Sequence, residues 1–215
     1  MRVYFISGLG ADKTVFQLLD LSYCEPVFVD WITPLHNESL QHYALRISGA
    51  YNIPGDAFIV GLSFGGMLAT EIAKAFPQTR VILLSSAKTK NEIPVIYKIG
   101  KYLPAYKWLP ISMQKFFMLL IEKRFGIISG KGKEIYREVI RQADISFNTW
   151  AIWALLHWDN MAVPPNITHI HGTADKILNY RNIEGAVAFK GGGHLMVLEN
   201  AREISIILRN ITMHL

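Results

Sequence analysis

Short hydrophobic runs alternate with amphipathic stretches along most of this chain. The runs at residues 3–6, 27–29, 57–60, 81–84, 167–171 and 185–189 have the length of buried strands. Residues 14–19, 39–50, 66–76 and 199–209 predict helices, and Pro77 ends the third of these. Strands that alternate with helices favour a parallel sheet covered by helices on both faces. We therefore predict an α/β fold with a mostly parallel sheet of about six strands.

This alternation stops between residues 87 and 161. No strand pattern is found there, and three or four helical segments are separated by Pro94, Pro104, Pro110 and a Ser-Gly-Lys-Gly turn at residues 129–132. The sequence thus predicts a core made of residues 1–86 and 162–215, with residues 87–161 as a helical insertion.

The composition suits one domain with an inserted subdomain, since 51% of the 215 residues are hydrophobic. The single cysteine, Cys24, excludes an intrachain disulfide and is expected to be a half-buried packing residue. The first residues lack the apolar segment of a secretory signal, and the apolar run at residues 116–121 is too short to cross a bilayer. We expect a cytoplasmic protein.

Positive charge is concentrated in the helical insertion. Residues 87–161 hold twelve Lys or Arg and six Asp or Glu, whereas the rest of the chain is close to neutral. A solvated helix surface is one interpretation, and contact with an anionic substrate, an acidic lipid surface or a carrier protein is another. Because Phe116, Phe117, Phe125 and Ile127 alternate with basic residues, an interfacial helix is a further alternative. No nucleic-acid-binding motif accompanies the charge, so we expect no nucleic acid partner. The oligomeric state stays open.

A G-x-S-x-G pattern at residues 61–65 lies between a predicted strand and a predicted helix. A serine on such a sharp turn projects its hydroxyl group away from the backbone, and glycines let the neighbouring backbone approach. Ser63 is therefore the candidate nucleophile. A glycine-rich turn without catalytic function is the alternative.

An acid and a histidine follow in settings that fit this candidate. Asp175 lies in the loop after the strand at residues 167–171, and His194 follows three glycines after the strand at residues 185–189. The carboxyl ends of parallel strands meet at one edge of a sheet, so Ser63, Asp175 and His194 can converge there. Asn91 and Glu92, after the fourth strand, are rivals of Asp175 as the acid.

With these residues the chain resembles the α/β-hydrolase-fold family over nearly its whole length. The resemblance rests on the ISGLGAD segment at residues 6–12, the turn at Ser63, the HGTAD segment at residues 171–175 and the Gly193-His194 pair. It implies an α/β-hydrolase fold whose sheet is reduced at the N-terminus, with residues 87–161 as a helical cap.

The resemblance also implies a mechanism. His194 would be the general base for Ser63, Asp175 would orient the histidine, and the backbone N–H groups of Leu9 and Phe64 would form the oxyanion hole. Ser7 stands where the family usually has histidine, which does not change the donor because the donor is a backbone amide.

The implied activity is hydrolysis of an ester or thioester of a small to medium apolar substrate, through an acyl-enzyme and without a cofactor. An acyltransferase or a lyase would use the same triad, and a non-catalytic protein that binds a small ligand would use the same fold. The sequence does not determine the natural substrate.

Three tryptophans near the end of the helical insertion are candidate substrate-pocket residues: Trp150, Trp153 and Trp158. Core packing between insertion and body is the alternative. His169 and His171 share one face of a strand and, with Asp175, suggest a metal site. We expect none, because His171 already belongs to the HGTAD pattern. Asp12 is predicted to cap the helix at residues 14–19.

Overall fold

The computed structural model describes residues 1–102, 108 and 110–214. In these residues the centre of the fold is a six-stranded sheet in the order β2-β1-β3-β4-β5-β6, and every neighbouring pair is parallel. The strands are β1 (Arg2–Ile6), β2 (Glu25–Val29), β3 (Phe58–Leu62), β4 (Arg80–Leu84), β5 (Ile167–Gly172) and β6 (Val187–Phe189). The predicted fold class is therefore confirmed.

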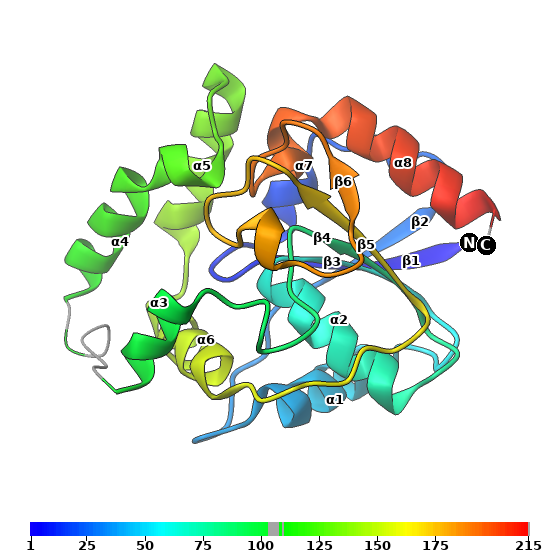
Figure 1. Ribbon diagram of the computed structural model, residues 1–215, viewed down its shortest axis with the longest axis horizontal. Helices are drawn as coiled ribbons and strands as arrows, with labels where there is room; N and C mark the ends of the chain where they lie inside the picture. Colours follow the sequence, from blue (N-terminus) through cyan, green and yellow to red (C-terminus); the bar gives the residue numbers. More distant parts are fainter. Residues whose placement is uncertain (103–107, 109, 215) are drawn as a thin grey trace.

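Helices cover both faces of the sheet (Figure 1). One face packs against α1 (Leu40–Ala50) and α2 (Phe64–Ala75), and the other against η1 (Lys13–Phe16), α7 (Met196–Glu199) and α8 (Ala201–His214). Successive side chains of a strand point to opposite faces. Accordingly, Tyr4 and Ile6 of β1 enter the first core and Val3 and Phe5 the second.

The chain between β4 and β5 forms helices at one side of the sheet (Figure 1). They are α3 (Val95–Lys98), η2 (Ile99–Lys101), α4 (Ile111–Leu120), η4 (Glu122–Phe125), α5 (Gly130–Gln142) and α6 (Ile145–His157). The described part of this helical segment, residues 87–161, has no strand. Pro110 directly precedes α4, as predicted, whereas Pro104 lies outside the described residues.

Local details differ from the sequence prediction at three places. The predicted turn at residues 129–132 is the start of α5, because the Ser129 side chain caps that helix by accepting from the Gly132 N–H. The helix predicted at residues 14–19 is a short 3₁₀ turn, capped by Asp12 as expected. The predicted closing helix is divided at Asn200 into α7 and α8. Cys24 is half-buried, as expected.

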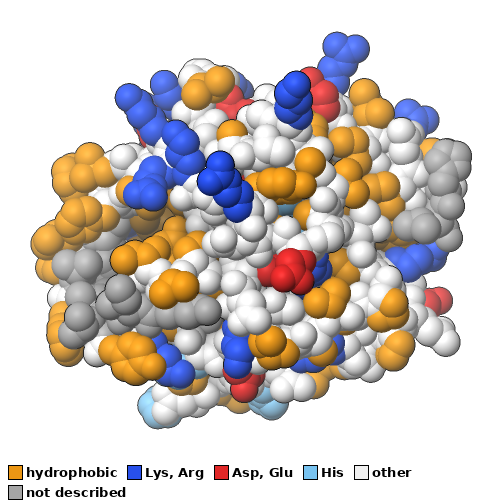
Figure 2. All heavy atoms as spheres, in the orientation of Figure 1, with side chains coloured by type: hydrophobic (Ala, Val, Ile, Leu, Met, Phe, Trp, Pro, Cys, Tyr) orange, Lys and Arg blue, Asp and Glu red, His pale blue; other side chains and the backbone are white. Residues whose placement is uncertain are grey.

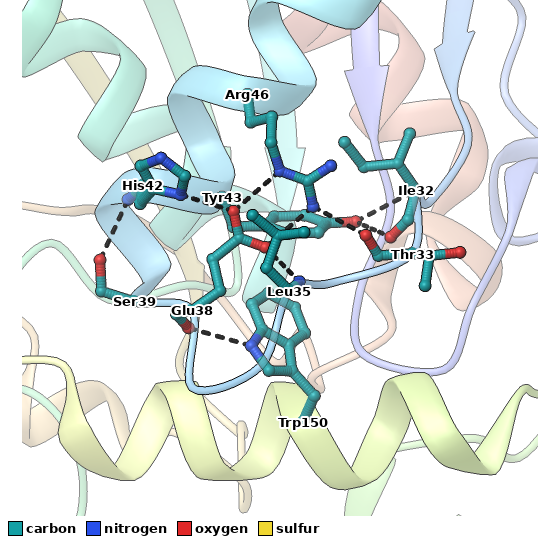
Figure 3. A network of polar contacts seen from close by, with 9 residues as sticks. All are labelled: Ile32, Thr33, Leu35, Glu38, Ser39, His42, Tyr43, Arg46 and Trp150. Carbon is teal, nitrogen blue, oxygen red and sulfur yellow. Dashed lines mark hydrogen bonds and ion pairs between the residues drawn. The ribbon is translucent and has the colours of Figure 1, made fainter.

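A buried carboxylate connects the loop after β2 with α1 and α6 (Figure 3). The Glu38 side chain accepts hydrogen bonds from Arg46 Nε and Nη2, each at 2.8 Å, and from the Leu35 N–H at 2.8 Å; His42 Nδ1 lies 2.7 Å away. Its backbone carbonyl accepts from Trp150 Nε1 of α6 at 3.0 Å. Burial raises the pKa of Glu38, but these donors outweigh it and lower the pKa to about 2.

None of the helices in the described residues combines the length and hydropathy needed to span a membrane.

Candidate active site

Ser63 is the single residue between the end of β3 and the start of α2. Its backbone has φ 51° and ψ −117°, a region that residues with a side chain rarely adopt. The turn is held on both sides: the Ser63 N–H donates to the Leu84 carbonyl at 2.9 Å, and Ser86 Oγ donates to the Ser63 carbonyl at 2.6 Å. This geometry presents the hydroxyl group at the carboxyl end of the sheet.

The glycines beside Ser63 are required by close backbone approach. A Cβ atom on Gly65 would lie 2.2 Å from the Ser7 carbonyl oxygen and 2.4 Å from that of Ile6. One on Gly61 would lie 2.5 Å from the Gly66 Cα. Neither position has room for a side chain. Because glycine has none, α2 can begin directly against β1 and β3.

Asp175 and His194 meet Ser63 from the ends of two other strands. His194 Nε2 lies 2.9 Å from Ser63 Oγ, and His194 Nδ1 lies 2.7 Å from Asp175 Oδ2. The histidine and the aspartate are buried, with 2% of His194 and 4% of Asp175 exposed. The three residues predicted from their order in the sequence thus form one continuous hydrogen-bonded chain.

The Asp175 carboxylate is surrounded by donors. Its Oδ1 accepts from the N–H groups of Ile177 and Leu178 at 2.8 and 2.9 Å, and its Oδ2 also lies 3.2 Å from His171 Nε2. Burial alone would raise the pKa of Asp175, but the His194 charge and the hydrogen bonds hold it well below its ordinary value. The carboxylate therefore stays ionised and orients the His194 ring.

The two histidines of β5 extend the chain of contacts beyond this carboxylate. His171 Nε2 faces two acceptors, Asp175 Oδ2 and the Leu178 carbonyl oxygen at 2.8 Å, so this nitrogen carries the proton. The other ring nitrogen, His171 Nδ1, lies 3.2 Å from His169 Nε2. Burial, followed by the electrostatic influence of His171 and Lys88, lowers the pKa of His169 well below its ordinary value. In the described residues, His, Cys, Asp and Glu side chains do not gather in threes that could hold a metal ion.

Glu92, the rival acid, is bound elsewhere. Its carboxylate accepts from the backbone N–H groups of Lys88 and Glu184 and lies 3.5 Å from Lys88 Nζ. This buried pair ties the loop after β4 to the loop before β6. Asn91 is exposed. Asp175 is thus the carboxylate that contacts His194.

The loop after β1 packs directly against Ser63. A Cβ atom on Gly8 would lie 3.4 Å from the Ser63 Cβ. Ser7 closes the loop through a hydrogen bond from its Oγ to the Ala11 carbonyl at 2.7 Å. Leu9 and Phe64 line the same cavity as Ser63, and Phe64 opens α2, where a backbone N–H has no partner within the helix. Both predicted oxyanion donors therefore belong to residues beside the nucleophile.

Ser63 and His194 line a cavity of about 360 Å³ between the sheet and the helical segment. Helices α4, α5 and α6 contribute one side of its apolar wall, including Phe117, Met118 and Ile152. The described lining residues include no Lys, Arg, Asp or Glu. The cavity is at the small end of the range for ligand sites, so it suits a neutral, largely apolar group of modest size. A second cavity of about 470 Å³, beside Asp12 and Asp144, has no triad residue in its lining.

The prediction that three tryptophans line the substrate pocket is wrong. None of Trp150, Trp153 and Trp158 is among the described residues that line the cavity. Trp150 donates to the Glu38 carbonyl, Trp158 Nε1 donates to Glu71 Oε1 at 2.7 Å, and the Trp153 ring stacks on His157.

The face of α6 that lines the cavity carries Asn148, Ile152 and Leu155, which are spaced four and three residues apart. The tryptophans lie on other faces of the helix or at its end, where they dock the helical segment on the body of the protein.

Sequence reasoning missed a contact that supports the histidine. The Phe125 ring meets the His194 ring edge-on with centroids 5.5 Å apart, and the Phe125 carbonyl accepts from the Leu195 N–H at 3.0 Å. Gly126, at φ 80°, lets the chain pass Gly193 so closely that a Cβ atom would lie 2.7 Å from its Cα. The only signal in the sequence is Gly126 itself, because the partners are far apart along the chain.

Comparison with known proteins agrees with this architecture. A sequence profile described as "Alpha/beta hydrolase family" matches residues 3–205. No curated protein matches the chain.

Similar solved structures include two esterases. One, from Thermogutta terrifontis with malate bound, has a TM-score of 0.75 and 16% identity, over 99% of this chain and 89% of the other. The other, from Exiguobacterium antarcticum, has a TM-score of 0.75 and 16% identity, over 98% and 91%. A meta-cleavage product hydrolase from Pseudomonas fluorescens IP01 has a TM-score of 0.68 and 18% identity, over 98% and 89%. At these identities the likeness shows the fold.

Proposed function

This chain belongs to the alpha/beta hydrolase family, and we propose that it is a serine hydrolase that cleaves an ester or thioester of a small to medium apolar substrate. The observation that carries the proposal is the continuous contact from Ser63 Oγ to His194 and on to Asp175, at 2.9 and 2.7 Å, inside an apolar cavity. Nucleophile, base and orienting acid are all within hydrogen-bond distance before any substrate is bound.

The proposed reaction has two halves. His194 Nε2 takes the Ser63 proton as Ser63 Oγ attacks the substrate carbonyl carbon, and the resulting oxyanion accepts hydrogen bonds from the Leu9 and Phe64 N–H groups. The imidazolium gives its proton to the leaving alcohol or thiol as the carbonyl forms again. Water, deprotonated by His194, then releases the acid from the acyl-enzyme and restores Ser63.

The cavity supports the proposed substrate class. Its described lining is mainly aliphatic and aromatic and includes no charged side chain of Lys, Arg, Asp or Glu. A volume of about 360 Å³ favours short to medium acyl or alcohol groups over long chains. We propose that the helical segment acts as a cap that excludes water from this cavity.

The direct test is labelling with a fluorophosphonate probe. Wild-type protein should be labelled, and Ser63→Ala should abolish labelling. With p-nitrophenyl esters, His194→Ala should lower kcat by about a thousandfold or more. Labelling that persists in Ser63→Ala, or a mild loss in His194→Ala, would contradict the triad.

Three alternatives share the fold. An acyltransferase would form the same acyl-enzyme but pass the acyl group to an added alcohol or thiol, so product analysis with and without such an acceptor separates the two. A lyase would release products without taking up water, which isotope-labelled water detects. A binding protein would show neither labelling nor turnover.

A further inference from the structure

Helix α4 carries hydrophobic side chains on two of its faces. Gln114, Phe117 and Met118 line the catalytic cavity, as does Ile121 just after the end of the helix. A second stripe, which we call the outer face of α4, consists of Met113, Phe116, Phe117 and Leu120. Their exposed fractions are 42%, 57%, 46% and 61%.

The outer face has the spacing of an amphipathic helix stripe, i, i+3, i+4 and i+7. Surface helices normally turn such a stripe toward the core and place polar residues opposite it. Within α4 the only charged residue is Lys115, whose Nζ donates to the Arg141 carbonyl. Contiguous exposed hydrophobic side chains with a polar rim are typical of protein or membrane interaction sites.

Basic side chains adjoin this stripe. Residues 111–142 hold seven Lys or Arg and three Glu. Lys123 and Arg124 lie in η4, the short turn after α4, and are exposed. Figure 2 shows hydrophobic side chains along the edge of the molecule formed by α4, with Lys and Arg side chains gathered above them over α4 and α5. Ion pairs to Glu122, Glu134 and Glu138 leave a net positive charge on this surface.

We propose that the outer face of α4 and the basic side chains beside it dock on the surface of an anionic lipid bilayer. The hydrophobic stripe enters the boundary between headgroups and acyl chains, while the cations contact the anionic headgroups. Charge complementarity selects this occupant over a second copy of the chain, because a symmetric dimer through this surface would bring two net positive patches together.

Docking has a consequence for the cavity. Phe117 belongs to both faces of α4, so the helix that touches the lipid is also a wall of the cavity that holds Ser63. An apolar substrate dissolved in the bilayer would then be separated from the catalytic cavity by this one helix. The docking surface rests on exposure and charge, and it is independent of the reaction that Ser63 carries out.

Vesicle flotation of the full chain tests this surface. The wild type should float with phosphatidylcholine vesicles that contain phosphatidylglycerol, and high salt or pure phosphatidylcholine should weaken binding by about tenfold. The double variant Phe116→Ser, Leu120→Ser removes exposed side chains that do not line the cavity. It should lose binding by at least about tenfold, as should Lys123→Glu with Arg124→Glu.

The matched control is Ile206→Ser on α8, which removes a side chain that is 52% exposed on another helix. It should bind like the wild type, and all variants should keep the wild-type circular dichroism spectrum. Absence of wild-type binding to the mixed vesicles at low salt, or an equal loss in Ile206→Ser, overturns the proposal. A dimer seen by light scattering that Phe116→Ser, Leu120→Ser dissociates would assign the surface to a second copy instead. No readout depends on catalysis, so failure here leaves the proposed reaction untouched.

Discussion

The Nε2 atom of His171 lies 3.2 Å from Asp175 Oδ2, the same oxygen that receives the hydrogen bond from His194. His171 is fully buried, and its proton position is fixed because the Leu178 carbonyl also accepts from Nε2. In the proposed mechanism His171 therefore acts on Ser63 only through Asp175 and His194, as a positioning residue.

Replacing His171 should slow the reaction without weakening substrate binding. In His171→Leu the carboxylate loses a donor, and we expect kcat to fall by about tenfold to a hundredfold with little change in KM. His171→Gln keeps an N–H group near Oδ2 and should recover part of the loss. The pH dependence of kcat checks the role, because its acidic limb should shift in His171→Leu and return toward the wild type in His171→Gln. If His171→Leu and His171→Gln lost kcat only in proportion to the loss of folded protein, the role of His171 would be structural.

Glu38 should make folding sensitive to acid. Its pKa is about 2 in the folded protein against an ordinary 4.5, so the folded state binds its proton more weakly than the unfolded chain does. The stabilisation is therefore present above about pH 4.5 and is lost as the pH falls toward 2. Glu38→Gln should lower the free energy of unfolding at neutral pH by up to about 3 kcal/mol, and the difference from the wild type should shrink through this window.

Denaturant unfolding at a series of pH values measures this effect. Glu25→Gln is the control, since the Arg2–Glu25 pair is exposed and such pairs contribute little. If Glu38→Gln keeps the acid sensitivity of the wild type between pH 4.5 and 2, other carboxylates must cause it.

A methyl group at Gly65 should disrupt the turn that holds Ser63. The added Cβ would press on the carbonyl oxygens of Ser7 and Ile6, which are backbone atoms at the end of β1 and cannot rotate away. Gly65→Ala should lose about 3 kcal/mol of stability or more, together with fluorophosphonate labelling. Gly49→Ala in α1 meets no atom within 4 Å and should instead gain up to about 1 kcal/mol. Thermal unfolding compares the stability of the two variants. A Gly65→Ala variant as stable as Gly49→Ala would contradict this account.

The residues of the candidate triad could be predicted because their signals are local. Ser63 needs glycines at fixed offsets, and Asp175 and His194 each follow a recognisable strand. The parallel sheet brings such positions together whatever their separation in sequence. The hydrophobic pattern likewise predicted the order of strands and helices along the chain, without any knowledge of side-chain contacts.

The wall of the cavity could not be predicted, because α6 is apolar around nearly its whole circumference. In the sequence Ile-Ser-Phe-Asn-Thr-Trp-Ala-Ile-Trp-Ala-Leu-Leu-His no stripe stands out, so periodicity does not say which face meets the cavity. The phase of the helix is set by long-range contacts instead, such as those of Trp150 with Glu38 and of Trp158 with Glu71. These contacts bring Asn148 to the cavity, where the sequence predicted tryptophan.

Asn148 has the environment of a residue kept for function at a cost in stability. It is 2% exposed and lines the cavity, yet its side-chain oxygen and nitrogen have no hydrogen-bond partner among the described residues. The amide packs against Gly10 of the loop beside Ser63, since a Cβ atom there would lie 2.9 Å from Asn148 Nδ2. Buried polar groups without partners each cost about 1–3 kcal/mol.

Asn148→Leu, which keeps the branched shape and removes the polar atoms, should therefore raise the free energy of unfolding by about 1 kcal/mol or more while lowering kcat/KM. Thermal unfolding and ester hydrolysis of the same preparation measure both effects. Ile152→Leu, one turn further along the same wall, is the control: an apolar exchange of equal volume should change stability by less than about 1.5 kcal/mol and leave activity near the wild type. A less stable Asn148→Leu would show that the amide supports the fold. A more stable variant with unchanged activity would show that neither the loop nor the substrate uses the amide.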